Sequence, residues 1–201
     1  MTRLFNAQIE IDSPRRLSER SGFSMIELLS VIVIIGLLTA IALPRSGLAS
    51  YRANSGAQVV STALSYAQRQ AISRQADTRV GFDVVNNRMR LHEDRNNDNL
   101  IDADERVTFA NLPEGLTFGR GTAAARAMGG EVVTFSRAQG ILPVLTFHRD
   151  GTASEDGGVY ITTIAGLSVD RTADVRAVEI SRATGRTTWF SYATGTWKER
   201  Q

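Results

Sequence analysis

The residues with the clearest potential for chemistry lie in one polar segment, residues 94–105. Oxygen-bearing side chains stand at positions 1, 3, 5, 9 and 12 of this segment, and a hydrophobic residue stands at position 8. Calcium takes roughly six to eight hard oxygen ligands, and the EF-hand calcium loop uses this alternation together with a backbone carbonyl at position 7. The sequence therefore predicts a calcium site with these donors: Asp94, Asn96, Asp98, the carbonyl of Leu100, Asp102 and Glu105.

Two features leave a plain polar turn as the alternative to calcium binding. Asn99 stands at position 6, where an EF-hand has glycine, although asparagine tolerates the left-handed backbone conformation needed there. No helical pattern flanks the segment, because the alternating residues at 88–94 and 106–110 predict strands on both sides. The segment therefore also fits the turn of a β-hairpin.

Catalytic chemistry is not indicated by the sequence. The chain has no cysteine, which excludes disulfides, thiolate zinc sites and thiol catalysis. His148, Asp150 and Ser154 are residue types of a hydrolase triad, but they crowd into one turn, whereas triads draw on separated segments. The sequence contains no phosphate-binding glycine loop and no HExxH segment. We therefore expect no enzyme activity.

The charge balance argues against a protein that coats nucleic acid. The 201 residues include 23 Lys and Arg against 21 Asp and Glu, for a formal net charge of +2, and every basic residue except Lys198 is arginine. A local patch could still bind DNA, because basic residues interleaved with aromatic ones make phosphate contacts and stack on bases. Such residues gather near the C-terminus, where a DNA site would use Arg176, Arg182 and Arg186 beside Trp189, Phe190, Tyr192 and Trp197.

One uncharged apolar run near the N-terminus distinguishes this chain from an ordinary soluble domain. Residues 28–43 are sixteen residues without a charge, and with Phe23 and Ile26 the stretch approaches the roughly 20 residues that span a bilayer as a helix. A cleaved secretory signal would have a shorter apolar core followed by a small-residue cleavage site. Glu27 lies inside the run, and an ionisable residue at membrane depth costs about 2.5–3.5 kcal/mol, which indicates a function with a partner.

The residues around this acid resemble the N-terminal segment of type IV pilins and of the pilin-like proteins of type II secretion. The shared features are a basic leader, the pair Gly22 and Phe23, the acid Glu27 and a long apolar helix. The resemblance implies that a prepilin peptidase cuts between Gly22 and Phe23, which removes residues 1–22 as a leader peptide, and that Phe23 becomes N-methylated. Glu27 is then the fifth residue of the mature chain.

The same resemblance implies how the chain assembles and where it lies. Residues 23–44 form the transmembrane and assembly helix, with Pro44 at its first kink, and Glu27 of one subunit pairs with the N-terminal amine of a neighbouring pseudopilin. A carboxylate that is costly to bury thereby sets the register of a helical filament. The other implied partners are the prepilin peptidase, which is also the N-methyltransferase, and the inner-membrane assembly platform. Basic residues before the span keep the N-terminus cytoplasmic and the C-terminal domain periplasmic; they are Arg15, Arg16 and Arg20.

Beyond Pro44 the helix is expected to continue as an amphipathic segment, residues 45–77, that enters a globular domain. Apolar and small residues recur there at spacings of three and four, as on the buried face of a helix. Polar residues fall around this stripe, which indicates packing on a domain rather than a membrane span. The stripe consists of Ala57, Val60, Leu64, Ala67 and Ala71.

Residues 78–201 change to a period of two, which predicts a β domain of short antiparallel strands separated by turn residues. The expected strands cover residues 79–85, 88–94, 106–110, 131–136, 143–149, 157–166, 175–181 and 186–192, with a loop or short helical turn at 123–130. The predicted fold class is α+β and pilin-like, with one long N-terminal helix, membrane-spanning in its first half, packed on an antiparallel β domain.

The C-terminal half resembles, within that family, the H-type pseudopilins of type II secretion and the FimT group of minor pilins. The resembling segments are 146–152, 175–180 and 184–186. The resemblance implies a minor pseudopilin of the inner membrane, incorporated into a periplasmic pseudopilus, with a structural role in protein secretion across the outer membrane. The alternative is a minor type IV pilin that initiates pilus assembly or binds DNA for uptake. The implied structural role requires no cofactor. Calcium is the only ion for which the sequence offers a site.

Overall fold

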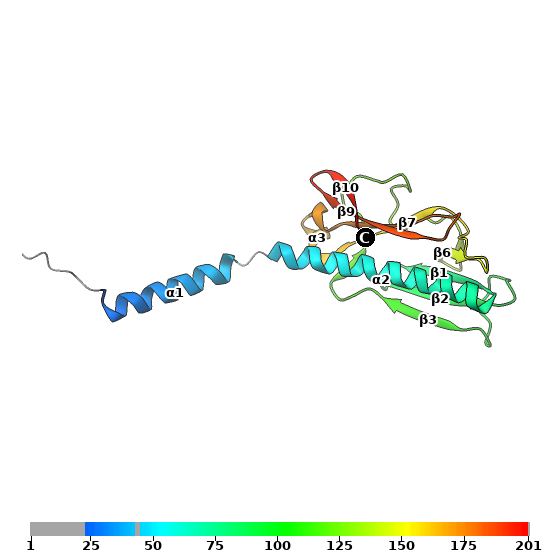
Figure 1. Cartoon of the computed structure of the whole chain (residues 1–201), viewed down its shortest axis with the longest axis horizontal. Coiled ribbons are helices and arrows are strands. Elements are labelled where there is room, and N and C mark those ends of the chain that lie inside the picture. Colours follow the sequence, from blue (N-terminus) through cyan, green and yellow to red (C-terminus); the bar gives the residue numbers. More distant parts are fainter. Residues whose placement is uncertain (1–22, 43–44, 201) are drawn as a thin grey trace, which may run out of the picture. The chain divides into compact units, whose positions relative to one another are not determined.

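The computed structural model describes residues 23–42 and 45–200, and the chain divides into two compact units, residues 1–43 and 44–201. The described part of the first unit is the helix α1 (Met25–Ala42). The second unit begins with the long helix α2 (Arg45–Arg74) and continues as a β domain (Figure 1). Its other elements are β1 (Asp77–Asp83), β2 (Arg88–Asp94), β3 (Val107–Asn111), β4 (Leu116–Phe118), β5 (Ala138–Gln139), β6 (Leu142–Phe147), β7 (Gly157–Thr163), α3 (Ile164–Ser168), η1 (Thr172–Asp174), β8 (Arg176–Ile180), β9 (Thr187–Ala193) and β10 (Thr196–Arg200).

The helix α1 is apolar on every side. Its large hydrophobic side chains from Met25 to Leu38 are all exposed. Within the described ranges, no helix meets the length and apolarity expected of a membrane span. The helix begins at a serine cap, because the Glu27 backbone N–H donates to both the side-chain Oγ and the carbonyl oxygen of Ser24, at 3.2 and 3.1 Å.

The helix α2 buries a stripe of small and branched residues along most of its length. The predicted stripe residues Ala57, Val60, Leu64, Ala67 and Ala71 are all fully buried, as the spacing of three and four indicates. Gly56 continues the stripe and has no room for a side chain, since a Cβ there would lie 2.5 Å from Leu116 Cδ1. Small residues on this face let the helix axis approach the sheets closely.

The helix α2 ends at Arg74, three residues before the predicted boundary at 77. Gln75 adopts a left-handed backbone with φ of 54°, and the Ala76 N–H donates to the Ala71 carbonyl at 3.3 Å. This is the hydrogen bond of a Schellman C-cap, which stops a helix without a proline. The chain then enters β1 at Asp77.

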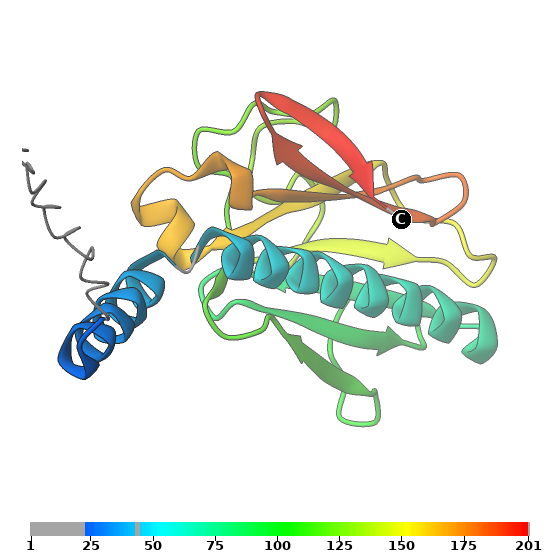
Figure 2. The same ribbon diagram turned by 60° about the vertical axis from the view of Figure 1, so that its left-hand side comes forward.

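Two antiparallel sheets form the rest of the domain. Their strand orders are β3-β2-β1-β6-β5 and β10-β9-β8-β7-β4. The helix α2 lies lengthwise against both sheets, with β1, β2 and β3 on one side of it and β7, β9 and β10 on the other, as both views show (Figures 1 and 2). One hydrophobic core joins α2 to both sheets. The predicted α+β class, a long helix packed on antiparallel sheets, is confirmed.

Strand positions agree best where alternation and turn residues coincide. The strand at 88–94 has the predicted bounds, whereas the predicted strand at 131–136 is wrong, since the backbone of this segment pairs with the sheet only as an isolated bridge between Val133 and Val159. The predicted strand at 157–166 ends at Thr163, because that side chain caps α3. The strands β4, β5 and β10 were not predicted from the sequence. The expected loop at 123–130 is present.

Close packing of β7 on β8 generates a stability prediction at Gly158. A Cβ there would overlap the Val178 carbonyl oxygen and the Met128 sulfur, whereas a Cβ at Gly81 of β1 would make ordinary contacts of 3.4–3.5 Å with Leu142 and Val144. We expect Gly158→Ala to destabilise the domain by about 1–3 kcal/mol through overpacking, and Gly81→Ala to have little effect. Denaturant unfolding of the full chain in detergent measures both, and equal losses would contradict this account of the β7–β8 contact.

Candidate functional site

The start of α1 contains the residues predicted for processing and assembly. Phe23 is 80% exposed, and Glu27 is exposed in the first turn of the helix. Ser24 and Glu27 have the spacing of a capping box, a serine followed three residues later by glutamate, and this spacing is a sequence signal for the helix start. Gly22 and Pro44, the other predicted residues, lie outside the described residues, as does the leader 1–22.

The position of Glu27 is electrostatically favourable for a carboxylate. The backbone N–H groups of the first turn give a helix start a partial positive charge, which stabilises an anion by about 0.3–1 kcal/mol. Glu27 is the only acid in α1, and the helix has no basic residue in its last turn. The Glu27 side chain is exposed, and the side-chain hydrogen bond at this helix start comes from Ser24.

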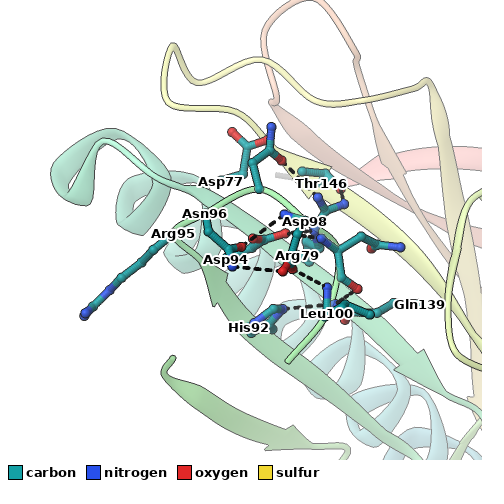
Figure 3. Close-up of polar contacts among 12 residues, drawn as sticks. Asp77, Arg79, His92, Asp94, Arg95, Asn96, Asp98, Leu100, Gln139 and Thr146 are labelled. Atoms are coloured by element: carbon teal, nitrogen blue, oxygen red, sulfur yellow. Dashed lines mark hydrogen bonds and ion pairs between the residues drawn. The ribbon is translucent and has the colours of Figure 1, made fainter. Parts of the chain in front are cut away.

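The predicted calcium segment 94–105 lies at the end of β2, where a buried arginine holds its first residue (Figure 3). Asp94 is fully buried, and its Oδ2 accepts from Arg79 Nε at 2.5 Å and from the Asn99 N–H at 3.1 Å. The Arg79 guanidinium also donates to Thr146 Oγ1 at 3.2 Å and to Asn97 Oδ1 at 3.0 Å. Arg79 therefore joins β1, β6 and the segment in one polar cluster.

The other predicted calcium donors bond mainly within the segment. Asn96 Oδ1 accepts from the Asp98 N–H at 3.1 Å, and Asn96 Nδ2 donates to the carboxylates of Asp98 and Asp102, both at 2.9 Å. Asp98 Oδ1 accepts from the Leu100 N–H at 2.7 Å. These hydrogen bonds order the segment, which has no helix on either side.

A histidine holds Glu105, the last predicted donor. His92 Nε2 lies 2.6 Å from Glu105 Oε2, and Gln139 Nε2 lies 3.1 Å from His92 Nδ1. Because the Gln139 amide donates to Nδ1, the imidazole proton lies on Nε2 and is donated to Glu105. Burial opposes ionisation of Glu105, but hydrogen bonds from His92 and from the Arg95 and Asp102 N–H groups hold its pKa below the usual value. Glu105 is thus a carboxylate.

The fit of this segment to calcium is partial. Asn99 has the left-handed φ of 67° expected at position 6, and Asp94 Oδ1 is buried without a hydrogen-bond partner. Against this, Arg79 already neutralises Asp94, and within the described part of the chain no three acidic or histidine side chains are grouped to hold a metal ion. Calcium binding stays a prediction, which calorimetric titration of the full chain and of a Glu105→Gln variant with calcium tests.

Arg176, predicted for the DNA alternative, is not at the surface. It is 3% exposed and donates to Asn54 Oδ1 at 2.7 Å, to the carbonyls of Ala173 and Val175 at 2.8 Å, and to the Ser50 carbonyl at 3.3 Å. Burial lowers its pKa to about 10, so it stays charged at neutral pH. A side chain bound in this way cannot reach a phosphate, so the prediction that Arg176 contacts DNA is wrong. Arg176 instead ties β8 to α2.

The remaining basic and aromatic residues near the C-terminus do not form one surface for bases. Arg182 and Arg186 are exposed, but Trp197 donates to the Ala124 carbonyl and packs edge-on against Tyr192. The Arg126 guanidinium stacks 3.5 Å from the Phe190 ring centre while it pairs with Glu179. These rings are occupied by protein contacts.

The predicted absence of a hydrolase triad agrees with the local geometry. His148 Nδ1 lies 3.0 Å from Asp77 Oδ2, Asp150 accepts from Thr152, and Ser154 Oγ accepts from the Thr146 N–H at 3.2 Å. The histidine therefore bonds to an acid on another strand, and no hydrogen bond joins it to the serine.

A capped apolar helix that carries one acid, followed by an α+β domain built on a second long helix, is the architecture of a pilin-like subunit. A family profile described as "Type II transport protein GspH" matches residues 56–184, and one described as "Prokaryotic N-terminal methylation motif" matches residues 17–43. No curated protein and no solved structure matches the chain. Because the first profile covers more than half of the chain, the chain belongs to the GspH family of type II secretion pseudopilins.

This membership decides between the functions left open by the sequence. The chain is a minor pseudopilin of type II secretion rather than a type IV pilin, and its role is structural and not enzymatic, as is that of its family. The N-terminal methylation profile implies anchoring in the inner membrane.

The Arg79–Asp94 pair generates a second stability prediction. Asp94→Ala leaves the Arg79 guanidinium buried without its carboxylate, which costs about 3–5 kcal/mol in comparable buried pairs. Asp98→Ala is the matched control, since that carboxylate is exposed and bonds only within the segment. Denaturant unfolding of the two full-length variants compares them, and an equally small loss in both would show that the pair does not hold the segment.

Proposed function

We propose that the mature subunit begins at Phe23, after a prepilin peptidase cuts between Gly22 and Phe23 and methylates the new N-terminus. Residues 1–22 are then a leader, residues 23–44 anchor the chain in the inner membrane, and residues 45–201 lie in the periplasm. The proposal is supported by the order of the leader, the capped helix and the acid, and by the methylation profile over residues 17–43. The basic residues before residue 22 favour a cytoplasmic N-terminus.

The interaction that carries this proposal is a pairing between Glu27 and the N-terminal amine of a neighbouring pseudopilin. All of the described large side chains of α1 are exposed, and all of them except Glu27 are apolar. Lipid or other subunits must therefore cover the helix. A carboxylate in such surroundings costs about 2.5–3.5 kcal/mol unless a positive group neutralises it. The amine freed at Phe23 is such a group, and it becomes available only after cleavage.

The pairing explains why assembly depends on processing. Before the cut, the backbone nitrogen of Phe23 belongs to a peptide bond and carries no charge. After the cut, the ammonium of one subunit matches the carboxylate of the next, and a mismatch of one helical turn leaves both charges unpaired. The charge pair therefore selects the register between neighbouring helices. The resulting filament is the periplasmic pseudopilus on the inner-membrane assembly platform.

The cleavage site is tested by mass spectrometry of the chain purified from membranes of a type II secretion host. The expected mass corresponds to a chain that begins at Phe23 with one added methyl group. A Gly22→Leu variant should retain residues 1–22, because a bulky residue stands at the cleaved bond. An intact leader in the unchanged chain, or a cut elsewhere, would refute the proposal.

The pairing role is tested with Glu27→Gln, which keeps the shape of the side chain and removes its charge. We expect normal amounts of protein in the membrane but at least tenfold less secretion and less co-purification of other pseudopilins, since about 1.4 kcal/mol corresponds to tenfold in an equilibrium. Ser24→Ala is the control, because it removes the helix cap and leaves the carboxylate. Equal loss in both variants would point to helix capping rather than to pairing.

A further inference from the structure

The short helix α3 exposes apolar side chains next to the first turns of α2. The exposed fractions are 53% for Ile164, 44% for Leu167 and 62% for Val169, and Leu48 in the first turn of α2 is 65% exposed. We refer to Leu48, Ile164, Leu167 and Val169 together as the α3 surface. Single exposed apolar residues are common, but a group of them at one end of a domain indicates a partner.

Hydrogen bonds place α3 and the following turn beside the start of α2. The Ile164 N–H donates to the Gly115 carbonyl at 2.9 Å, and Gly115 lies against the Arg52 guanidinium. Arg176, the first residue of β8, donates to the Ser50 carbonyl of α2. Both views show α3 beside the first turns of α2 (Figures 1 and 2).

The apolar side chains face outward because the N-terminal cap of α3 and Gly166 are buried against the domain. Thr163 caps the helix by accepting from the Gly166 N–H at 2.9 Å, and its hydroxyl donates to the buried Asp174 at 2.9 Å. A Cβ at Gly166 would lie 2.5 Å from Thr163 Oγ1, so this side of α3 is closed against the domain. A surface helix of a soluble domain normally has the opposite arrangement, with its apolar face inside.

The residues around the α3 surface include types that are favoured at a phospholipid surface. Arg52 and Arg171 are exposed at this end of the domain, and Tyr51 is 73% exposed next to Arg52. Arginine and tyrosine are favoured at membrane interfaces. Of the nearby acids, Asp174 is buried and 3.7 Å from Arg171, whereas Asp170, which accepts from Thr122, and Glu114 are both exposed.

The membrane anchor keeps this end of the domain close to the bilayer. Leu48 follows the last residue of α1, Ala42, by six positions, so their Cα atoms are at most about 23 Å apart in any arrangement of the two helices. We propose that the α3 surface rests on the periplasmic leaflet of the inner membrane and holds the domain there before assembly. This inference rests on the anchoring described under the proposed function.

The contact is tested with the full chain in vesicles of phosphatidylethanolamine and phosphatidylglycerol. The chain has no cysteine, so one introduced cysteine carries the only fluorescent label. Val169→Cys probes the α3 surface, and Leu100→Cys is the matched control, since the two side chains are 62% and 63% exposed. Leu100 follows β2, whose Asp94 pairs with Asp77 near the end of α2, and α2 is about 45 Å long.

Quenching by lipids with a nitroxide near the head group is the readout. We expect the label at 169 to be quenched and the label at 100 to stay in water. Adding Ile164→Ser and Leu167→Ser should lower the quenched fraction of the label at 169 roughly tenfold or more, because these side chains supply most of the buried apolar area. Both residues are exposed, so the domain should keep its unfolding temperature.

Three results would overturn the contact. The first is equal quenching at 169 and 100 in chains that float with the vesicles, which leaves the anchor intact. The second is self-quenching of the label at 169 that grows with the protein-to-lipid ratio, which assigns the α3 surface to a second copy of the chain. The third is a chain that does not float, which removes the anchoring and the contact together.

Discussion

The close approach of α2 to both sheets is the constraint on which the rest of the domain depends. The buried residues of the helix are all small or branched, and a methyl group on Gly56 would overlap Leu116 of β4. Because one helix face packs on two sheets, the sheets are held at fixed positions along it. Two polar links, Arg176 to Asn54 and Gln68 to the carbonyls of Gly151 and Thr184, then fix each end of the contact.

The sequence predicted the local elements well, because their signals are local. The stripe on α2 follows from residue spacing, and the strand at 88–94 follows from alternation between turn residues. The segment 131–136 has the same alternation but forms only one bridge, to the part of β7 that precedes the residues paired with β4. The burial of Arg176 could not be predicted from neighbouring residues either, because its partner Asn54 lies 122 residues away in the sequence. Exposure of a charged residue is decided by such distant partners.

The polar segment after β2 shows how one pattern of residues can serve two purposes. Acidic and amide side chains at alternate positions supply oxygens to a cation, and they equally accept hydrogen bonds from the turns that they enclose. In this domain Arg79 and His92, from β1 and β2, provide the positive charge and the proton that Asp94 and Glu105 accept. The sequence contains no local sign of these two partners, since both lie at strand positions that resemble their neighbours. The start of α1 at Ser24, by contrast, has a local signal, because a serine three residues before a glutamate is typical of a helix N-terminus.

The packing of α2 along its length on both sheets also has a mechanical consequence. A load along the axis of α2 enters the domain at the start of this helix, where the domain joins the preceding part of the chain. Contacts spread from Ala53 to Ala71 then resist together in shear, whereas a helix attached at one end would peel away one turn at a time. The domain can therefore transmit an axial load without losing its core.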